Sequence, residues 1–171
     1  MKPPLLIFFI LIALTASAQR PEAVFTRENM VLPAIPTPIG NYTSVVRVGN
    51  LLFLSGRGPM QLDGTYVVGK LVKDLSVQQG YDAAKLCALA QLAVLKAELG
   101  ELSRIKRIVK VTGFINGVDT FTDQPKVING FSDMMVAVFG NIGIHTRSAV
   151  GVSSLPGGWP VEVEMIVELK E

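Results

Sequence analysis

Arg147 and Glu162 are the residues whose types and spacing best suit chemistry on a small acidic molecule. Arg147 begins a β-prone run and shares a strand face with Ala149 and Gly151, whose small side chains leave space above the backbone. A guanidinium beside such a floor can hold a carboxylate in a bidentate pair, which fixes both its position and its plane. The alternative is an ordinary ion pair within the chain, with Glu162 or Glu164.

Three glutamates share the second face of the last β-prone run, and they are Glu162, Glu164 and Glu168. A carboxylate beside an electrophilic carbon can orient or deprotonate a water molecule, which is the role of a general base. The alternative is a solvated sheet edge or a subunit interface. The residues alone leave both interpretations open.

Other kinds of site lack the residues they need. The sequence has no G-x-S-x-G elbow, no phosphate-binding P-loop, no HExxH and no dinucleotide glycine fingerprint. Cys87 is the only cysteine and lies in an apolar run, which indicates a buried, inert thiol and excludes an intrachain disulfide. His145 is the only histidine, and one imidazole cannot build a zinc site of the usual kind. We therefore predict no metal.

The charge balance argues against a nucleic-acid partner. The chain has 16 Lys and Arg against 14 Asp and Glu, and it has no basic stripe. An apolar run from Leu5 to Leu14 follows Lys2, and the small residues at 16–18 suit signal peptidase. This run is too short to span a bilayer, which takes roughly 20 apolar residues. We predict a signal peptide at 1–18, a periplasmic or secreted protein, and no membrane contact in the mature form.

The rest of the chain divides into an extended lead-in and one domain. Residues 19–41 are polar and rich in proline, so we expect extended structure there, with the single domain covering 42–171. The predicted elements are strands at 43–48 and 51–55, a helix that a Ser76–Gln79 capping box opens and Gly100 ends, a strand at 105–115, a helix between Pro125 and Gly140, and strands at 147–152 and 161–169. This order predicts a mixed sheet with both helices on one face.

Motifs near both ends of that domain resemble the YjgF/Rid family. They are IGNY (39–42), VGNL (48–51) and LSG (54–56) with Pro59 beyond, then TRSAV (146–150), LP (155–156) and VEVE (161–164), with VKVT (109–112) and Phe114 between them. The resemblance implies a chorismate-mutase-like α+β fold and a homotrimer with clefts between subunits. It also implies hydrolysis of enamines and imines without a cofactor.

The resemblance assigns roles to individual residues. It implies that Arg147 clamps the substrate carboxylate and that Glu162 handles the attacking water. It also implies that Tyr42, Ser55 and Gly56 line the cleft. Two further substrate-binding assignments, Ala149 and Asn129, accompany departures from the family pattern.

Ala149 stands where many members have cysteine, so its implied role is through the backbone carbonyl. Asn129 corresponds to a site asparagine, although the segment 122–132 is longer than is typical of the family. Taken alone, an Asn-Gly pair in a helix indicates a kink or a packing contact. We therefore expect Asn129 to contribute either to the site or to packing.

The implied reaction converts small 2-imino or 2-enamino acids to 2-oxo acids and ammonia. Three other interpretations stay open: a trimer that binds small carboxylates without turnover, a ribonuclease, and a scaffold in which Arg147 pairs with a carboxylate of its own chain. The expected partners are a small carboxylate and further copies of the chain.

Overall fold

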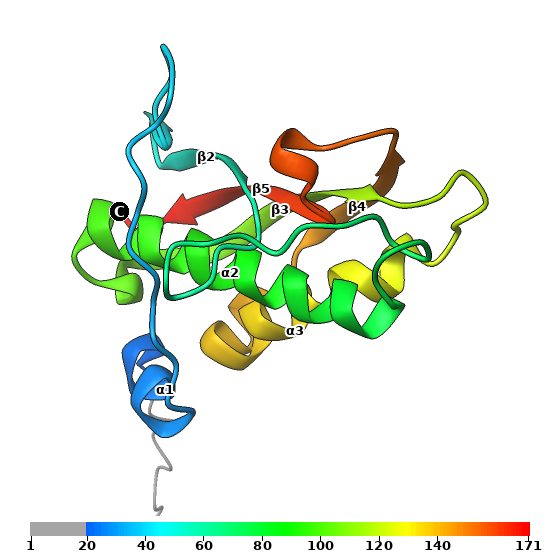
Figure 1. Ribbon diagram of the computed structural model, residues 1–171. Coiled ribbons are helices and arrows are strands. Elements are labelled where there is room, and N and C mark those ends of the chain that lie inside the picture. Colours follow the sequence, from blue (N-terminus) through cyan, green and yellow to red (C-terminus); the bar gives the residue numbers. More distant parts are fainter. Residues whose placement is uncertain (1–19) are drawn as a thin grey trace, which may run out of the picture.

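The computed structural model describes residues 20–171, so the predicted signal peptide at 1–18 lies outside the described residues. The described chain forms three α-helices and five strands (Figure 1). In order these are α1 (Pro21–Arg27), β1 (Val45–Val48), β2 (Leu51–Arg57), α2 (Val77–Leu99), β3 (Ile105–Asn116), α3 (Gln124–Phe139), β4 (Thr146–Val152) and β5 (Val161–Leu169). Within these residues no helix is both long and apolar enough to cross a bilayer.

The five strands make one mixed sheet in the order β1-β2-β5-β3-β4. The β3–β4 pair is parallel and the other neighbouring pairs are antiparallel. β4 therefore forms one edge of the sheet, while β5 lies in its middle between β2 and β3. The prediction of a mixed α+β sheet is confirmed.

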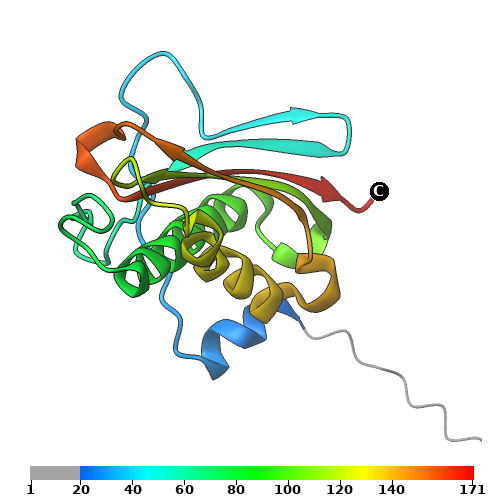
Figure 2. The same ribbon diagram turned by 90° about the vertical axis from the view of Figure 1, so that its right-hand side faces the viewer.

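Both long helices, α2 and α3, cover the same face of the sheet (Figure 2). Helix α2 begins where predicted, because Ser76 and Gln79 form a reciprocal capping box, and it ends at Gly100 with a positive φ. Along β5 the buried side chains alternate with partly exposed ones, so one face of that strand belongs to the core. On the opposite face of the sheet, no helix of residues 20–171 is packed. Val46 and Phe53 stand on that open face with 52% and 42% of their surface exposed.

The lead-in differs from the prediction, since residues 21–27 form helix α1 rather than extended chain. Pro21 suits the first turn of a helix, where its missing N–H costs nothing. Val24 is fully buried in the core, and the Glu22 carboxylate accepts hydrogen bonds from Leu102 N–H at 2.7 Å and Lys96 Nζ at 3.0 Å. Burial alone would raise the pKa of Glu22, but these bonds outweigh it and lower that pKa. The packed domain therefore begins well before Tyr42.

Candidate functional site

Arg147 lies on the edge strand β4 and points to the face that the helices cover. Its Cα pairs with that of Val111, which is fully buried beneath the helices. The side chain is exposed, and its Nη1 donates to Asn129 Oδ1 at 2.9 Å and to Ser132 Oγ at 3.0 Å. No carboxylate among residues 20–171 lies within ion-pair distance of it. The alternative of an ion pair with Glu162 or Glu164 is therefore not what the chain forms.

Helix α3 supplies both hydrogen-bond acceptors, because Asn129 and Ser132 are one turn apart on the same face. Two glycines bring this helix close to its neighbours. A Cβ on Gly113 of β3 would come within 2.3 Å of the Ile128 side chain, and one on Gly130 within 2.0 Å of the Tyr81 carbonyl oxygen. Within the Asn-Gly pair, Asn129 therefore contacts Arg147, and Gly130 makes a close packing contact with α2.

Ser132 and His145 join this cluster, although the sequence analysis did not assign them to it. Ser132 Oγ lies 3.1 Å from His145 Nε2, and His145 Nδ1 lies 2.6 Å from the Gly143 carbonyl oxygen. Because burial and the nearby positive charge of Arg147 outweigh the bond to Gly143, the pKa of His145 is lowered. The available signal was spacing, since His145 precedes Arg147 by only two residues, just before β4 begins.

Glu162 belongs to the open face of the sheet. Its Cα pairs with that of Phe114. Because side chains alternate along a strand, Glu162 points away from the face that buries its neighbours Val161 and Val163. Burial raises the pKa of Glu162, and the like charge of Glu164 raises it further. A Cβ on Gly56 would lie 2.1 Å from Glu162 Oε1, so only glycine leaves room for this carboxylate beside β2. A half-buried carboxylate with a raised pKa is suited to accept a proton.

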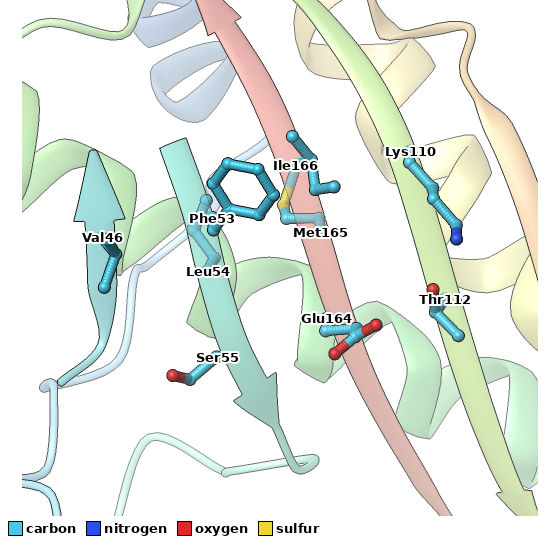
Figure 3. Close-up of a pocket in the computed structure, with 9 residues that line it drawn as sticks. All are labelled: Val46, Phe53, Leu54, Ser55, Lys110, Thr112, Glu164, Met165 and Ile166. Atoms are coloured by element: carbon cyan, nitrogen blue, oxygen red, sulfur yellow. The ribbon is translucent and has the colours of Figure 1, made fainter. Parts of the chain in front are cut away.

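Gly56 lies beside the Glu162 carboxylate, and Ser55 precedes Gly56 on β2. Tyr42 and Gly56 both line a cavity of about 200 Å³. Ser55, Glu164 and Thr112 line a second, open-face cavity of about 240 Å³ that spans β2, β5 and β3 (Figure 3). The Ser55 hydroxyl donates to the Thr43 carbonyl at 2.6 Å, which fixes its direction.

The predicted site residues therefore form two separate groups within one chain. Arg147, Asn129 and Ala149 lie at the β4 edge, with the half-buried Ala149 opposite Gly113 on the helix-covered side. Glu162 is two strands away on the other face of the sheet. Two interstrand spacings alone amount to about 10 Å. One chain thus does not bring the guanidinium and the carboxylate to a common small ligand.

Other side chains offer little reactive chemistry. Burial raises the pKa of the Cys87 thiol well above its ordinary value, and the Sγ lies 3.7 Å from the Val161 carbonyl oxygen. This agrees with the expectation of a buried, inert thiol. Across residues 20–171 no group of three His, Cys, Asp or Glu side chains is placed to hold a metal ion.

The similarity of this chain to known proteins extends over nearly all of the described residues. Residues 22–168 match the family model described as "YjgF/chorismate_mutase-like, putative endoribonuclease". Protein TCP17 of Trypanosoma cruzi is 43% identical over 151 residues, which cover 88% of this chain and 94% of that protein. The 2-iminobutanoate/2-iminopropanoate deaminase of Dermatophagoides farinae is 33% identical over 138 residues, which cover 81% and 93%. The family match at 22–168 spans the positions of both groups of site residues.

Solved structures share the fold over the same length. The Agrobacterium tumefaciens protein Atu1372, of unknown function, is similar with a TM-score of 0.82 and 39% identity, covering 88% of this chain and 92% of that one. A Shewanella oneidensis protein gives a TM-score of 0.85 with 34% identity, covering 88% and 100%. The fold of this chain is thus shared with known crystal structures.

Proposed function

Because the chain belongs to the YjgF/Rid family, we propose that it hydrolyses small 2-imino and 2-enamino acids to 2-oxo acids and ammonia. The observation that carries the proposal is the arrangement of Arg147. Its side chain is exposed, is held by two uncharged acceptors, and has no ion-pair partner among the described residues. The 33% identity to a protein named as an imine deaminase supports this reaction class.

Arg147 binds the substrate carboxylate in this proposal. Both hydrogen bonds to α3 use Nη1, so they do not compete with a carboxylate that pairs with the other edge, Nε with Nη2. Asn129 and Ser132 hold the plane of the guanidinium, and thereby the plane of the bound carboxylate. The adjacent imine carbon is then presented in a fixed direction, which lowers the entropic cost of the reaction.

Glu162 acts as the general base. It accepts a proton from water while the water oxygen forms a bond to the imine carbon and the imine nitrogen takes a proton from solvent. Protonated Glu162 then returns its proton to that nitrogen, the carbon–nitrogen bond breaks and ammonia leaves. The hydroxyl proton passes to solvent, and the oxygen becomes the carbonyl of the 2-oxo acid. A 2-enamino acid first gains a proton at C3. Because burial and Glu164 raise the pKa of Glu162, its carboxylate is a stronger base than an ordinary one.

The complete site needs two copies of the chain. Arg147 and Glu162 face opposite sides of one sheet, whereas the carboxylate carbon and the imine carbon of the substrate are directly bonded. We therefore propose a homotrimer in which Arg147, Asn129 and Ala149 of one subunit meet Glu162, Tyr42, Ser55 and Gly56 of the next. The exposed apolar side chains of the open sheet face are available for such an interface.

Ammonia release tests the proposal. We expect the protein to accelerate ammonia formation from 2-iminopropanoate generated in situ, and Arg147→Ala to lose most of this acceleration. Arg27→Ala serves as the control, because Arg27 is an exposed arginine of α1 that pairs only with its neighbour Glu28. Equal rates for wild type and Arg147→Ala would exclude the clamp. Binding of 2-oxo acids without ammonia release would instead indicate a carboxylate-binding protein.

The proposal also includes export. It is supported by the apolar run from Leu5 to Leu14 and the small residues at 16–18. Mass spectrometry of the protein recovered from its own cells should find a chain that begins at Gln19. A recovered chain that still carried residues 1–18 would contradict this part of the proposal.

A further inference from the structure

A chain of hydrogen bonds leads from Arg147 back to the protein interior. Arg147 Nη1 donates to Ser132 Oγ, which lies 3.1 Å from His145 Nε2, and His145 Nδ1 lies 2.6 Å from the Gly143 carbonyl oxygen. A carbonyl oxygen can only accept, so Nδ1 carries the imidazole proton and Nε2 must accept. The Ser132 hydroxyl then donates to His145, and its oxygen lone pair is turned toward Arg147. We call this Arg147–Ser132–His145–Gly143 chain the relay, and each of its hydrogen bonds has a defined donor and a defined acceptor.

Both hydrogen-bond partners of His145 are fixed to helix α3. Ser132 is part of that helix, and the turn that carries Gly143 packs directly on it. A Cβ at position 143 would lie 2.3 Å from the Met135 carbonyl oxygen, so the turn and the helix are in backbone contact. His145 is thus held between two parts of one rigid unit, and this unit sets the direction in which the Ser132 oxygen points.

The relay stays intact only while the imidazole is neutral, since a protonated Nε2 would donate instead of accept. Burial and the charge of Arg147 on the next strand lower the pKa of His145, while its bond to Gly143 opposes this. The groups that face the ring are Ser132 of α3, the Gly143 carbonyl and Arg147. The neutral form is therefore favoured at neutral pH.

We propose that His145 is a positioning residue, which acts through Ser132 to hold the Arg147 guanidinium in the orientation that receives a carboxylate. This inference rests on the proposed function, because it specifies how the same clamp is kept ready. An exposed arginine side chain is otherwise free to rotate, and binding must then order it. The relay imposes that order before the ligand arrives.

Two substitutions of His145 separate positioning from a general structural role. In His145→Gln the side-chain amide oxygen reaches the place of Nε2 and can accept from Ser132. In His145→Asn the shorter amide can still donate to Gly143 but does not reach Ser132. Pyruvate affinity, measured by calorimetry on the untagged protein, should fall about 5- to 10-fold in His145→Asn and in Ser132→Ala. It should stay within about 2-fold of wild type in His145→Gln.

The single histidine gives a direct spectroscopic readout. In the imidazole ¹⁵N spectrum we expect the Nδ1–H tautomer, and addition of pyruvate should shift the His145 signals. The double variant Ser132→Ala/His145→Asn should bind pyruvate no more weakly than either single variant, because both break the same relay. Additive losses, or the Nε2–H tautomer, would overturn the inference.

Arg147→Ala keeps the two hypotheses distinguishable. If wild type and Arg147→Ala bind pyruvate equally, the clamp of the proposed function is wrong. If Arg147→Ala loses binding while His145→Asn and Ser132→Ala bind as wild type does, the clamp stands and the relay is wrong. Thermal unfolding of each variant checks that a loss of binding is not a loss of fold.

Discussion

The guanidinium of Arg147 and the carboxylate of Glu162 belong to one sheet but have opposite surroundings. Arg147 is exposed on an edge strand, yet Asn129 and Ser132 hold its position. Glu162 lies mid-sheet, is half-buried, and its pKa is raised by burial and by Glu164 rather than lowered by donors. A binding group benefits from fixed direction, whereas a base benefits from weak stabilisation of its charge.

Each half of the proposed site is therefore prepared within its own chain, before any contact with a second copy. The arginine half is built by packing of α3 against β4, and the glutamate half by the close approach of β2 and β5 at Gly56. In the proposed homotrimer, a neighbouring copy needs only to bring two finished halves together. Activity from both halves within one chain would contradict this arrangement, and disturbing one half alone measures what that half contributes.

Mixing inactive variants gives the largest expected effect. Glu162→Gln should lower kcat roughly 10²- to 10⁴-fold, because the base is lost. Arg147→Ala should lose substrate binding, so neither variant releases ammonia efficiently alone. Unfolding and refolding the two together in equal amounts should restore roughly a quarter of the sites, since each site would take its halves from neighbouring subunits. Ammonia release by the mixture measures this directly.

The same refolding experiment can contradict a site that is shared between subunits. If the mixture stays as inactive as the separate variants while wild type recovers fully from the same refolding, Arg147 and Glu162 do not share a site between copies. Arg147→Ala that is unfolded and refolded alone is the matched control, because it undergoes the same treatment but contains no intact arginine half.

Gly130→Ala should disturb the arginine half next most strongly. The added methyl would meet the Tyr81 carbonyl oxygen, so α3 must move away from α2. We expect a loss of about 1–3 kcal/mol in the free energy of unfolding, and a higher KM because Asn129 and Ser132 move with the helix. Val136→Ala, on the exposed side of α3, should change stability by less than about 0.5 kcal/mol. Denaturant unfolding and KM measure both effects; an unchanged KM would show that α3 does not position the clamp.

Much of the fold follows from local sequence signals. The capping box at Ser76 and the stop at Gly100 set the ends of α2 within a residue, since both act over one helical turn. The alternation along residues 161–169 gave the buried face of β5 for the same local reason. Helix α1 was missed because Glu22 is held by Leu102 and Lys96, which lie 80 and 74 residues away in the sequence.

The candidate site divides in a similar way. The small residues beside Arg147 indicated a floor for a ligand, and that strand face is as expected. The bond from Ser132 to Arg147 depends on how α3 crosses β4, which no local pattern specifies. The opposite orientation of Glu162 depends on the register of β3 with both of its neighbours. A one-residue shift in either pairing would have reversed it.

Asn129 offers a smaller and more selective change to the arginine half. Asn129→Ala removes one of the two acceptors on Nη1, and a net loss of about 1 kcal/mol should raise KM roughly 5-fold with kcat nearly unchanged. Asn129→Asp places a carboxylate at the same position, so it should compete with the substrate for Arg147 and raise KM more than alanine does. Steady-state kinetics on 2-iminopropanoate checks the order. Equal KM values for the two variants would indicate that residue 129 does not contact the working guanidinium.

The smallest expected effect concerns the pH dependence of the glutamate half. Burial and the charge of Glu164 raise the pKa of Glu162, so Glu164→Gln should return that pKa part of the way toward its ordinary value while burial remains. Activity requires the ionised base, and the acidic limb of the pH–kcat profile should therefore move to lower pH. Glu168→Gln is the matched control, because Glu168 lies on the same strand but pairs with Lys106 and Arg107.

Stability should change with pH in the matching direction. A raised pKa means that the fold favours protonated Glu162, so this contribution is present below the ordinary pKa and is lost as the pH rises through the raised one. Glu164→Gln should reduce that loss, because the unfolded and folded pKa values of Glu162 come closer together. If Glu164→Gln leaves the acidic limb where wild type has it, Glu162 is not the group that titrates during catalysis. The general base of the reaction would then have to be a residue other than Glu162.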